Sequence, residues 1–98
     1  MPSFFVAQFS VTNADALAAY SKKAAGIMKR FGGKLVFKGS AEDRLFGASG
    51  HSNIAVFAFP TSSLLNDFYA CQDYRDLEDL RSRGADMVLS ACVAPAAE

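Results

Sequence analysis

Residues 53–59 are apolar on both faces of an extended chain, and this limits how the sequence can fold. Side chains alternate between the faces of a strand, so one face carries Ile54, Val56 and Ala58 and the other carries Ala55, Phe57 and Phe59. Two phenylalanines alone bring on the order of 300 Å² of apolar surface. An antiparallel sheet with helices on a single side would leave one face in water. The segment therefore predicts a strand that is covered on both sides.

The rest of the chain alternates strand and helix patterns around this segment. Pro60 ends the strand because it lacks an N–H for the ladder, and Thr61 can cap the helix that follows. The βαββαβ order is typical of a ferredoxin-like α+β fold, in which two helices cover one face of an antiparallel sheet. The expected elements are strand 4–11, helix 14–31, strand 34–38, strand 53–59, a helical segment that kinks near Gln72, has a second cap at Asp73 and ends at Gly84, and strand 86–94.

The uncovered face of such a sheet leads to a prediction about assembly. The chain has 98 residues, which suits a single domain over residues 1–98, and 51% of them are apolar, including nine phenylalanines. A second copy that packs sheet to sheet would cover the surplus. We therefore expect a homodimer of the dimeric α+β-barrel type.

Segment 39–52 is longer than an ordinary hairpin loop. In one interpretation, Arg44, Leu45 and Phe46 extend the second strand beyond an irregularity. In the other, the segment is a functional flap, since loops often carry binding residues.

The charge and the cysteine content limit which partners and which cellular location we expect. Ten basic residues balance ten acidic ones, so no overall field draws the chain to nucleic acid or to an anionic membrane. No apolar run approaches the roughly 20 residues that span a bilayer, and the N-terminus has the pattern of a strand, not of a signal peptide. Cys71 and Cys92 match no ligand spacing, and we expect free thiols in a reducing cytoplasm.

Three parts of the sequence resemble a known bacterial family when their order and spacing are taken together. They are Tyr20 on a helix that ends in Phe31-Gly32-Gly33, the strand that ends in Phe59-Pro60, and Phe68-Tyr69 followed by Asp73-Tyr74 and Arg81. This pattern is similar to that of the domain-of-unknown-function 1330 (DUF1330) family. The family belongs to the dimeric α+β-barrel superfamily, which includes small antibiotic-biosynthesis-type monooxygenases. The resemblance implies the same dimeric fold.

Arg81 is the first candidate for a binding residue. Leu77 and Arg81 lie three and seven residues after Tyr74, so a guanidinium projects from an inward-facing helical stripe. A buried arginine needs a partner because an unpaired charge is costly to desolvate. That partner could be the carboxylate of a ligand, or it could be Glu78 or Asp43 in a structural ion pair. The side chain could also extend along the surface to reach solvent.

His51 is the only histidine, and its ordinary pKa lies nearest to neutrality. It follows Gly47-Ala48-Ser49-Gly50, a segment that could fold over a cleft. As a general base it would need an orienting partner, and Asp43 is the nearest carboxylate on the same loop. The alternative is a surface histidine without chemistry.

Tyr20, Tyr69 and Tyr74 each carry a hydroxyl on a helix that should face the sheet. Tyr20 and Tyr74 are candidates to line a cavity beside Arg81, although core packing with the hydroxyl at the rim is the commoner arrangement. One histidine and two distant cysteines do not suit a metal site, so no metal is expected. No flavin, haem or nicotinamide signature is present, and any catalysis would proceed without a bound cofactor.

Two functions from different classes are consistent with the sequence. In the first, a homodimer binds a small anionic molecule in a cleft between sheet and helices, with Arg81, Tyr20, Tyr74 and His51 at the site. Such a protein could be a cofactor-independent enzyme. In the second, a dimeric structural or regulatory module has no turnover. The sequence contains no catalytic motif that decides between an enzyme and a binding protein.

Overall fold

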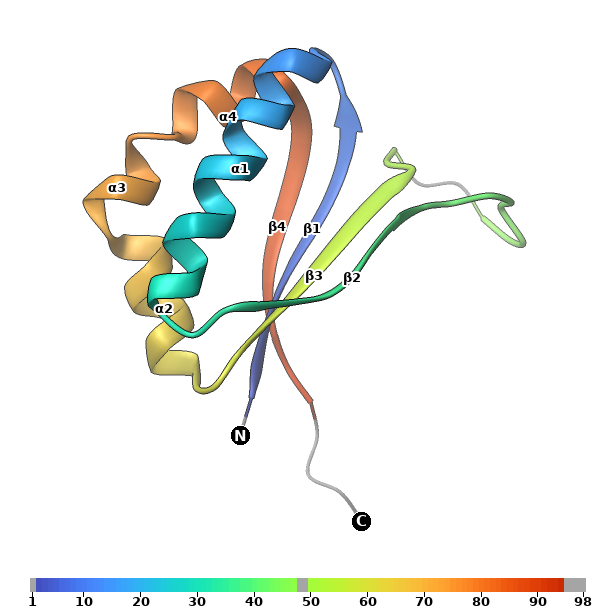
Figure 1. Ribbon diagram of the computed structural model, residues 1–98. Coiled ribbons are helices and arrows are strands. Elements are labelled where there is room, and N and C mark those ends of the chain that lie inside the picture. Colours follow the sequence, from blue (N-terminus) through green and yellow to red (C-terminus); the bar gives the residue numbers. More distant parts are fainter. Residues whose placement is uncertain (1, 48–49, 95–98) are drawn as a thin grey trace.

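Four antiparallel strands form one sheet in the order β2-β3-β1-β4, and the helices cover a single face of it (Figure 1). The computed structural model describes residues 2–47 and 50–94. The chain order confirms the ferredoxin-like α+β fold. Its elements are β1 (Ser3–Val11), α1 (Ala14–Arg30), β2 (Lys34–Ser40), β3 (Asn53–Phe59), α2 (Ser62–Ala70), α3 (Gln72–Arg75), α4 (Glu78–Gly84) and β4 (Ala85–Val93).

Helix α1 has a side-chain cap at its start and a glycine just beyond its end. The Asn13 side chain accepts a hydrogen bond of 3.0 Å from the Ala16 N–H, and Asp15 lies in the first turn, where the helix dipole favours a negative charge. Phe31 caps the C-terminus, and Gly32 follows it with a φ of +84°, the left-handed conformation that glycine adopts without steric cost.

The second helical segment is broken twice, once more than the sequence predicted. The first break is at Cys71, which is extended with ψ of 149° and separates α2 from α3. The second break, at Asp76 and Leu77, separates α3 from α4. The expected cap at Asp73 is wrong, because this residue lies inside the first turn of α3 and its carboxylate pairs with Arg30 at 2.7 Å.

A β-bulge interrupts the pairing of β2 with β3 at Val36. Leu35 pairs with Phe57, whereas the next paired residue, Phe37, is opposite Val56. The extra residue shifts the alternation of β2, so that Leu35 and Lys38 both lie on the helix-covered face. Phe37 lies on the open face.

Residues 41–47 of segment 41–52 project away from the body of the molecule beyond the ends of β2 and β3 (Figure 1). Strand β2 ends at Ser40, and the expected extension through residues 44–46 is wrong, because these residues form no strand. The side chains of Leu45 and Phe46 are 92% and 98% exposed. Ala48 and Ser49, part of the expected flap, lie outside the described residues.

The densest part of the core lies where α2 and α3 meet the sheet. The ring of Phe68 is fully buried, with its centroid 5.5 Å from Phe5, 5.4 Å from Phe59 and 4.6 Å from Tyr74. Aromatic pairs at these separations stabilise a fold beyond the area they bury. This aromatic cluster fixes α2 and α3 on the sheet.

The opposite face of the sheet has no covering element within the described chain. Pairing of Val6 with Val56 and of Phe4 with Ala58 places these apolar side chains together on that face. They are half-buried, and Phe37 beside them is exposed. Phe57 and Phe59, by contrast, face the helices.

Candidate functional site

An apolar cavity of about 220 Å³ lies between α1 and the sheet. Its roof includes Tyr20, Ala24 and Met28 from α1, and its floor includes Ala55 and Phe57 from β3. Helix α1 packs mainly against α4, not against the strands, which leaves the space beneath it unfilled. The cavity therefore follows from how α1 is held.

The close contact between α1 and α4 depends on Gly84. A Cβ atom at this position would lie 2.6 Å from the Leu17 backbone nitrogen, closer than folded chains permit. The Gly84 carbonyl also accepts hydrogen bonds of 3.0 and 3.1 Å from the N–H groups of Thr12 and Asn13. These contacts hold the start of α1 beside the end of α4.

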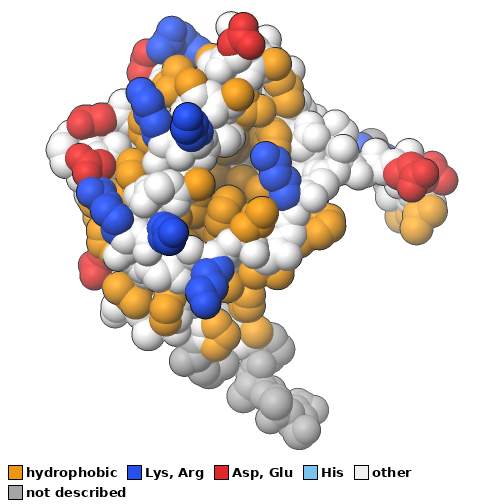
Figure 2. Space-filling model, viewed as in Figure 1, with side chains coloured by type: hydrophobic (Ala, Val, Ile, Leu, Met, Phe, Trp, Pro, Cys, Tyr) orange, Lys and Arg blue, Asp and Glu red, His pale blue; other side chains and the backbone are white. Residues whose placement is uncertain are grey.

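Basic residues border the cavity and the groove that continues from it. Lys38 lines the cavity, and Lys29 and Lys34 line the groove, which shares Met28 and Phe57 with the cavity. No aspartate or glutamate is found among the described residues that line either of them. Figure 2 shows this side of the molecule, with hydrophobic side chains inside a hollow and Lys and Arg side chains around it. We call Lys29, Lys34 and Lys38 the lysine rim.

Tyr20, Tyr74 and Arg81 form a hydrogen-bonded chain beside this cavity. The Arg81 Nη1 donates to the Tyr74 hydroxyl at 3.0 Å, and the hydroxyls of Tyr74 and Tyr20 are 2.7 Å apart. The Arg81 guanidinium also lies 5.8 Å from the centroid of the Tyr74 ring. The three residues come from α1, α3 and α4, and they are three of the four ligand-binding candidates from the sequence.

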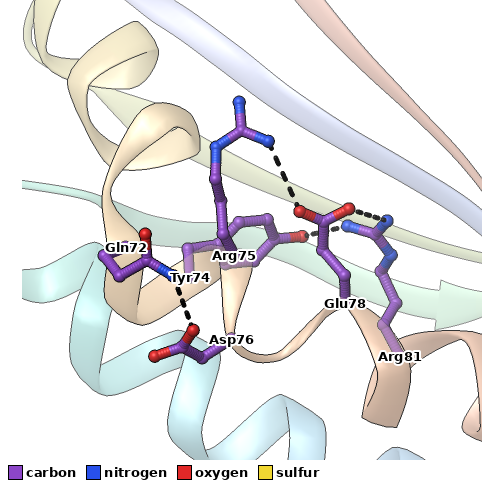
Figure 3. Close-up of polar contacts among 6 residues, drawn as sticks. All are labelled: Gln72, Tyr74, Arg75, Asp76, Glu78 and Arg81. Carbon is purple, nitrogen blue, oxygen red and sulfur yellow. Dashed lines mark hydrogen bonds and ion pairs between the residues drawn. The ribbon is translucent and has the colours of Figure 1, made fainter.

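Arg81 has a carboxylate partner on its own helix. Its Nη2 lies 3.9 Å from a Glu78 oxygen, and Glu78 also pairs with Arg75 at 3.4 Å (Figure 3). The Arg81 side chain is 16% exposed. Burial lowers its pKa, but the hydrogen bond with Tyr74 and the electrostatic interactions with Tyr74, Tyr20 and Tyr69 together outweigh it, so the pKa is raised and the group stays charged. The Glu78 pair was one of the alternatives that the sequence left open, while Asp43 lies exposed on segment 41–52.

The Tyr20 hydroxyl is held in its neutral form. Burial raises its pKa above the ordinary value, and the neighbouring Tyr74 raises it further, whereas Arg81 opposes the rise. Tyr20 can therefore donate a hydrogen bond at any physiological pH. Of the hydrogen-bonded residues Arg81, Tyr74 and Tyr20, only Tyr20 also lines the cavity.

His51 does not share a pocket with Arg81. Its Nδ1 lies 3.0 Å from the Ser10 hydroxyl, which also donates to the Gly50 carbonyl at 2.9 Å. Ser10 follows Phe9, which is buried on the helix-covered face, so Ser10 lies on the open face of the sheet. The expectation that His51 and Arg81 flank one cleft is wrong, because the sheet separates them.

Lys38 is a cavity residue that the sequence did not indicate. Residues 35–37 are all apolar, so the alternation of β2 could not be assigned to a face from the sequence alone. The bulge at Val36 sets that alternation. The small residues Ala24 and Ala25 were a weak signal, because they leave room beneath a helix.

Other kinds of site find no support in residues 2–47 and 50–94. This part of the chain contains no group of three or more His, Cys, Asp or Glu side chains that could hold a metal ion. Cys71 and Cys92 are free thiols. None of the described helices has the length and hydropathy needed to cross a membrane.

The fold places the chain among ferredoxin-like α+β proteins, and comparison with known proteins defines its family. The model of the family described as "Domain of unknown function (DUF1330)" matches residues 2–93. The chain therefore belongs to this family. No curated protein matches it.

Solved structures share the fold at low sequence identity. A protein of unknown function from Rhodopseudomonas palustris is 20% identical with a TM-score of 0.81, over 96% of this chain and 84% of that one. SnoaB, a cofactor-independent oxygenase from Streptomyces nogalater, is 13% identical with a TM-score of 0.70, over 98% and 95%. A dimeric ferredoxin-like protein of unknown function from a Jannaschia species is 8% identical with a TM-score of 0.66, over 96% and 100%.

Proposed function

We propose that the protein binds a small apolar organic anion in the cavity beneath α1. The observation that carries this proposal is an apolar space of about 220 Å³ whose border is basic. An apolar cavity of about 150 Å³ is large enough to bind benzene. The cavity beneath α1 has room for a larger ring system, with its acidic group at the lysine rim.

The two parts of the site would contribute differently to affinity. Burial of the apolar body supplies most of the free energy, at about 25 cal/mol per Å² removed from water. The exposed ammonium groups of Lys29, Lys34 and Lys38 add a smaller attraction that salt screens. Arg81 is not the anion anchor in this proposal, because Tyr74 and Glu78 already engage its guanidinium.

Titration calorimetry with 2-naphthoate tests the proposal. We expect binding to the wild type that weakens with rising salt and in Lys38→Gln. Ala25→Trp should block binding, because Ala25 lines both cavity and groove on an exposed part of α1. Ala19→Trp, at an exposed position of the same helix, is the control and should bind normally. Equal binding by both tryptophan variants would place the ligand elsewhere, and no binding by the wild type would favour the non-catalytic structural module.

We further propose that two copies assemble through the open face of the sheet. Within the described part of the chain no element covers the apolar side chains that three strands place there, among them Phe4, Val56 and Phe37. Leu45 and Phe46 on the projecting segment add exposed apolar surface. Whole sheet faces in contact would give an interface of the obligate class, above about 2,000 Å². The Jannaschia neighbour with this fold is described as dimeric, which supports a second copy as the occupant.

Light scattering of Val56→Asp tests the assembly. Val56 is only half-buried in the single chain, so its replacement should separate the copies without unfolding them. Ala19→Asp on the exposed side of α1 is the control and should stay dimeric. A wild-type protein that is monomeric at micromolar concentration would contradict the proposal.

A further inference from the structure

Arg81, Tyr74 and Tyr20 are hydrogen-bonded in series, and their two hydroxyls carry one more proton than the bonds among them use. A guanidinium donates and never accepts, so the Tyr74 oxygen accepts from Arg81. The hydroxyls of Tyr74 and Tyr20 carry one proton each, and a single hydrogen bond joins them. One of the two hydroxyl protons must therefore point to an acceptor outside these three residues.

The surroundings of the two hydroxyls decide which proton is spare. Tyr74 is 1% exposed, and aromatic rings surround it, including those of Phe5 and Phe68. No acceptor beyond Tyr20 contacts the Tyr74 hydroxyl within residues 2–47 and 50–94. If Tyr20 donated to Tyr74, the Tyr74 proton would be buried without an acceptor, which is unfavourable. The favourable order is therefore Arg81 to Tyr74 to Tyr20, with the spare proton on Tyr20.

We propose that the Tyr20 hydroxyl donates this proton into the cavity and that the bound ligand carries a carbonyl oxygen to accept it. The inference rests on the proposed function, since the same cavity holds the apolar body of the ligand. It narrows the ligand class to ring-sized ketones or quinones, with an acidic group at the lysine rim. Arg81 and Tyr74 are positioning residues, since they act through Tyr20. The positive charge of Arg81 strengthens the Tyr20 hydroxyl as a donor, because hydrogen bonds in series polarise one another.

A matched pair of probes isolates this hydrogen bond. 1-Tetralone and tetralin have the same bicyclic body and differ by one carbonyl group. We expect the wild type to bind 1-tetralone about three- to tenfold more tightly than the same body without the carbonyl, a preference that corresponds to one net hydrogen bond. Tyr20→Phe should abolish the preference, and Tyr74→Phe should reduce it. Infrared spectra should show a lower carbonyl stretching frequency for bound 1-tetralone in the wild type than in Tyr20→Phe.

The outcomes separate this inference from the proposed function. If both probes bind the wild type equally and Ala25→Trp blocks both, the cavity is a binding site without this donor, and the inference is wrong. If neither probe binds the wild type, the inference is wrong, and binding of 2-naphthoate decides the proposed function separately. If Tyr20→Phe does not fold, the wild-type infrared shift and the Tyr74→Phe preference decide: an unshifted carbonyl overturns the inference, and a shift that Tyr74→Phe diminishes supports it.

Discussion

The two halves of the helix-covered sheet face differ in how their centres are filled, and a further pocket of about 190 Å³ lies at the edge, between α2 and β4. Beneath α2 and α3, the rings of Phe5, Phe59, Phe68 and Tyr74 pack with centroids as close as 4.6 Å. Beneath α1, a space of about 220 Å³ is left open. Protein interiors normally pack as densely as organic crystals, and an unfilled apolar space lowers stability. In our proposal, the aromatic half maintains the fold and the half beneath α1 receives the ligand.

Truncation of one phenylalanine in each half is the strongest way to test the contrast. Phe68→Ala should lower the free energy of unfolding by about 3–5 kcal/mol, because a fully enclosed ring is removed. Phe57→Ala should cost less than half as much, because Phe57 is half-buried and borders the cavity. Urea denaturation at a single protein concentration measures both. Equal losses would show that the half beneath α1 is packed as tightly as the aromatic half.

Small additions to side chains should have opposite effects on the two sides of α1. Gly84→Ala should destabilise by about 1–3 kcal/mol, because the new methyl group meets the Leu17 backbone at 2.6 Å. Ala55→Val places its extra carbons in the cavity and should stabilise by about 0.5–1 kcal/mol while weakening 2-naphthoate binding. Thermal melts and calorimetry of the two variants check the signs. Destabilisation by Ala55→Val would mean that the cavity cannot accept added atoms.

Alkaline pH should lower the free energy of unfolding through Tyr20, which lies at the boundary between the two halves. The pKa of Tyr20 is raised in the folded state by burial and then by Tyr74, so the folded chain keeps a proton that the unfolded chain loses above about pH 10. The corresponding stability is complete below that pH and is lost as pH rises toward the folded-state pKa, at up to about 1.4 kcal/mol per pH unit. Unfolding free energies measured on both sides of pH 10 should show this slope.

Two variants identify the group responsible for that slope. Tyr20→Phe should flatten the alkaline decline, and Tyr69→Phe, at an exposed position of α2, should leave it unchanged. An equally steep decline in Tyr20→Phe would assign the effect to another residue.

The weakest expected effect concerns the ion pair that joins the two regions. Arg30 on α1 and Asp73 on α3 are 2.7 Å apart, but both side chains are more than half exposed, at 55% and 58%. Asp73→Asn should change stability by less than about 1 kcal/mol. Affinity for 2-naphthoate should not change, since α4 holds α1 in place. A large loss of affinity would show that this pair positions the roof of the cavity.

Much of the fold could be predicted because its signals are local. Pro60 ends β3, Asn13 and Gly32 bound α1, and the two-sided apolar pattern of β3 indicates an uncovered sheet face. These effects act through the backbone of a few neighbouring residues, so the sequence shows them directly. The boundaries of β4 and α1 were accordingly predicted to within one residue.

The cavity could not be predicted because it depends on contacts distant in sequence. A stripe that contains Tyr20 and Ala24 indicates a helix that faces a sheet, but it does not show how far away that helix lies. That distance is set by Gly84, on another element, which lets α1 approach α4. On this helix Met28 is buried, while Ile27 and Phe31 are only partly so.

The bulge at Val36 also affects how the sheet ends. Strand β2 is an edge strand, and its outer row of N–H and C=O groups could template the strand of another molecule. The bulge makes β2 a poor template, because its backbone N–H and C=O groups are not regularly spaced. An added strand would also meet the two positive charges of Lys34 and Lys38. The same single residue that turns Lys38 toward the cavity therefore also protects this apolar chain against growth of the sheet into a fibre.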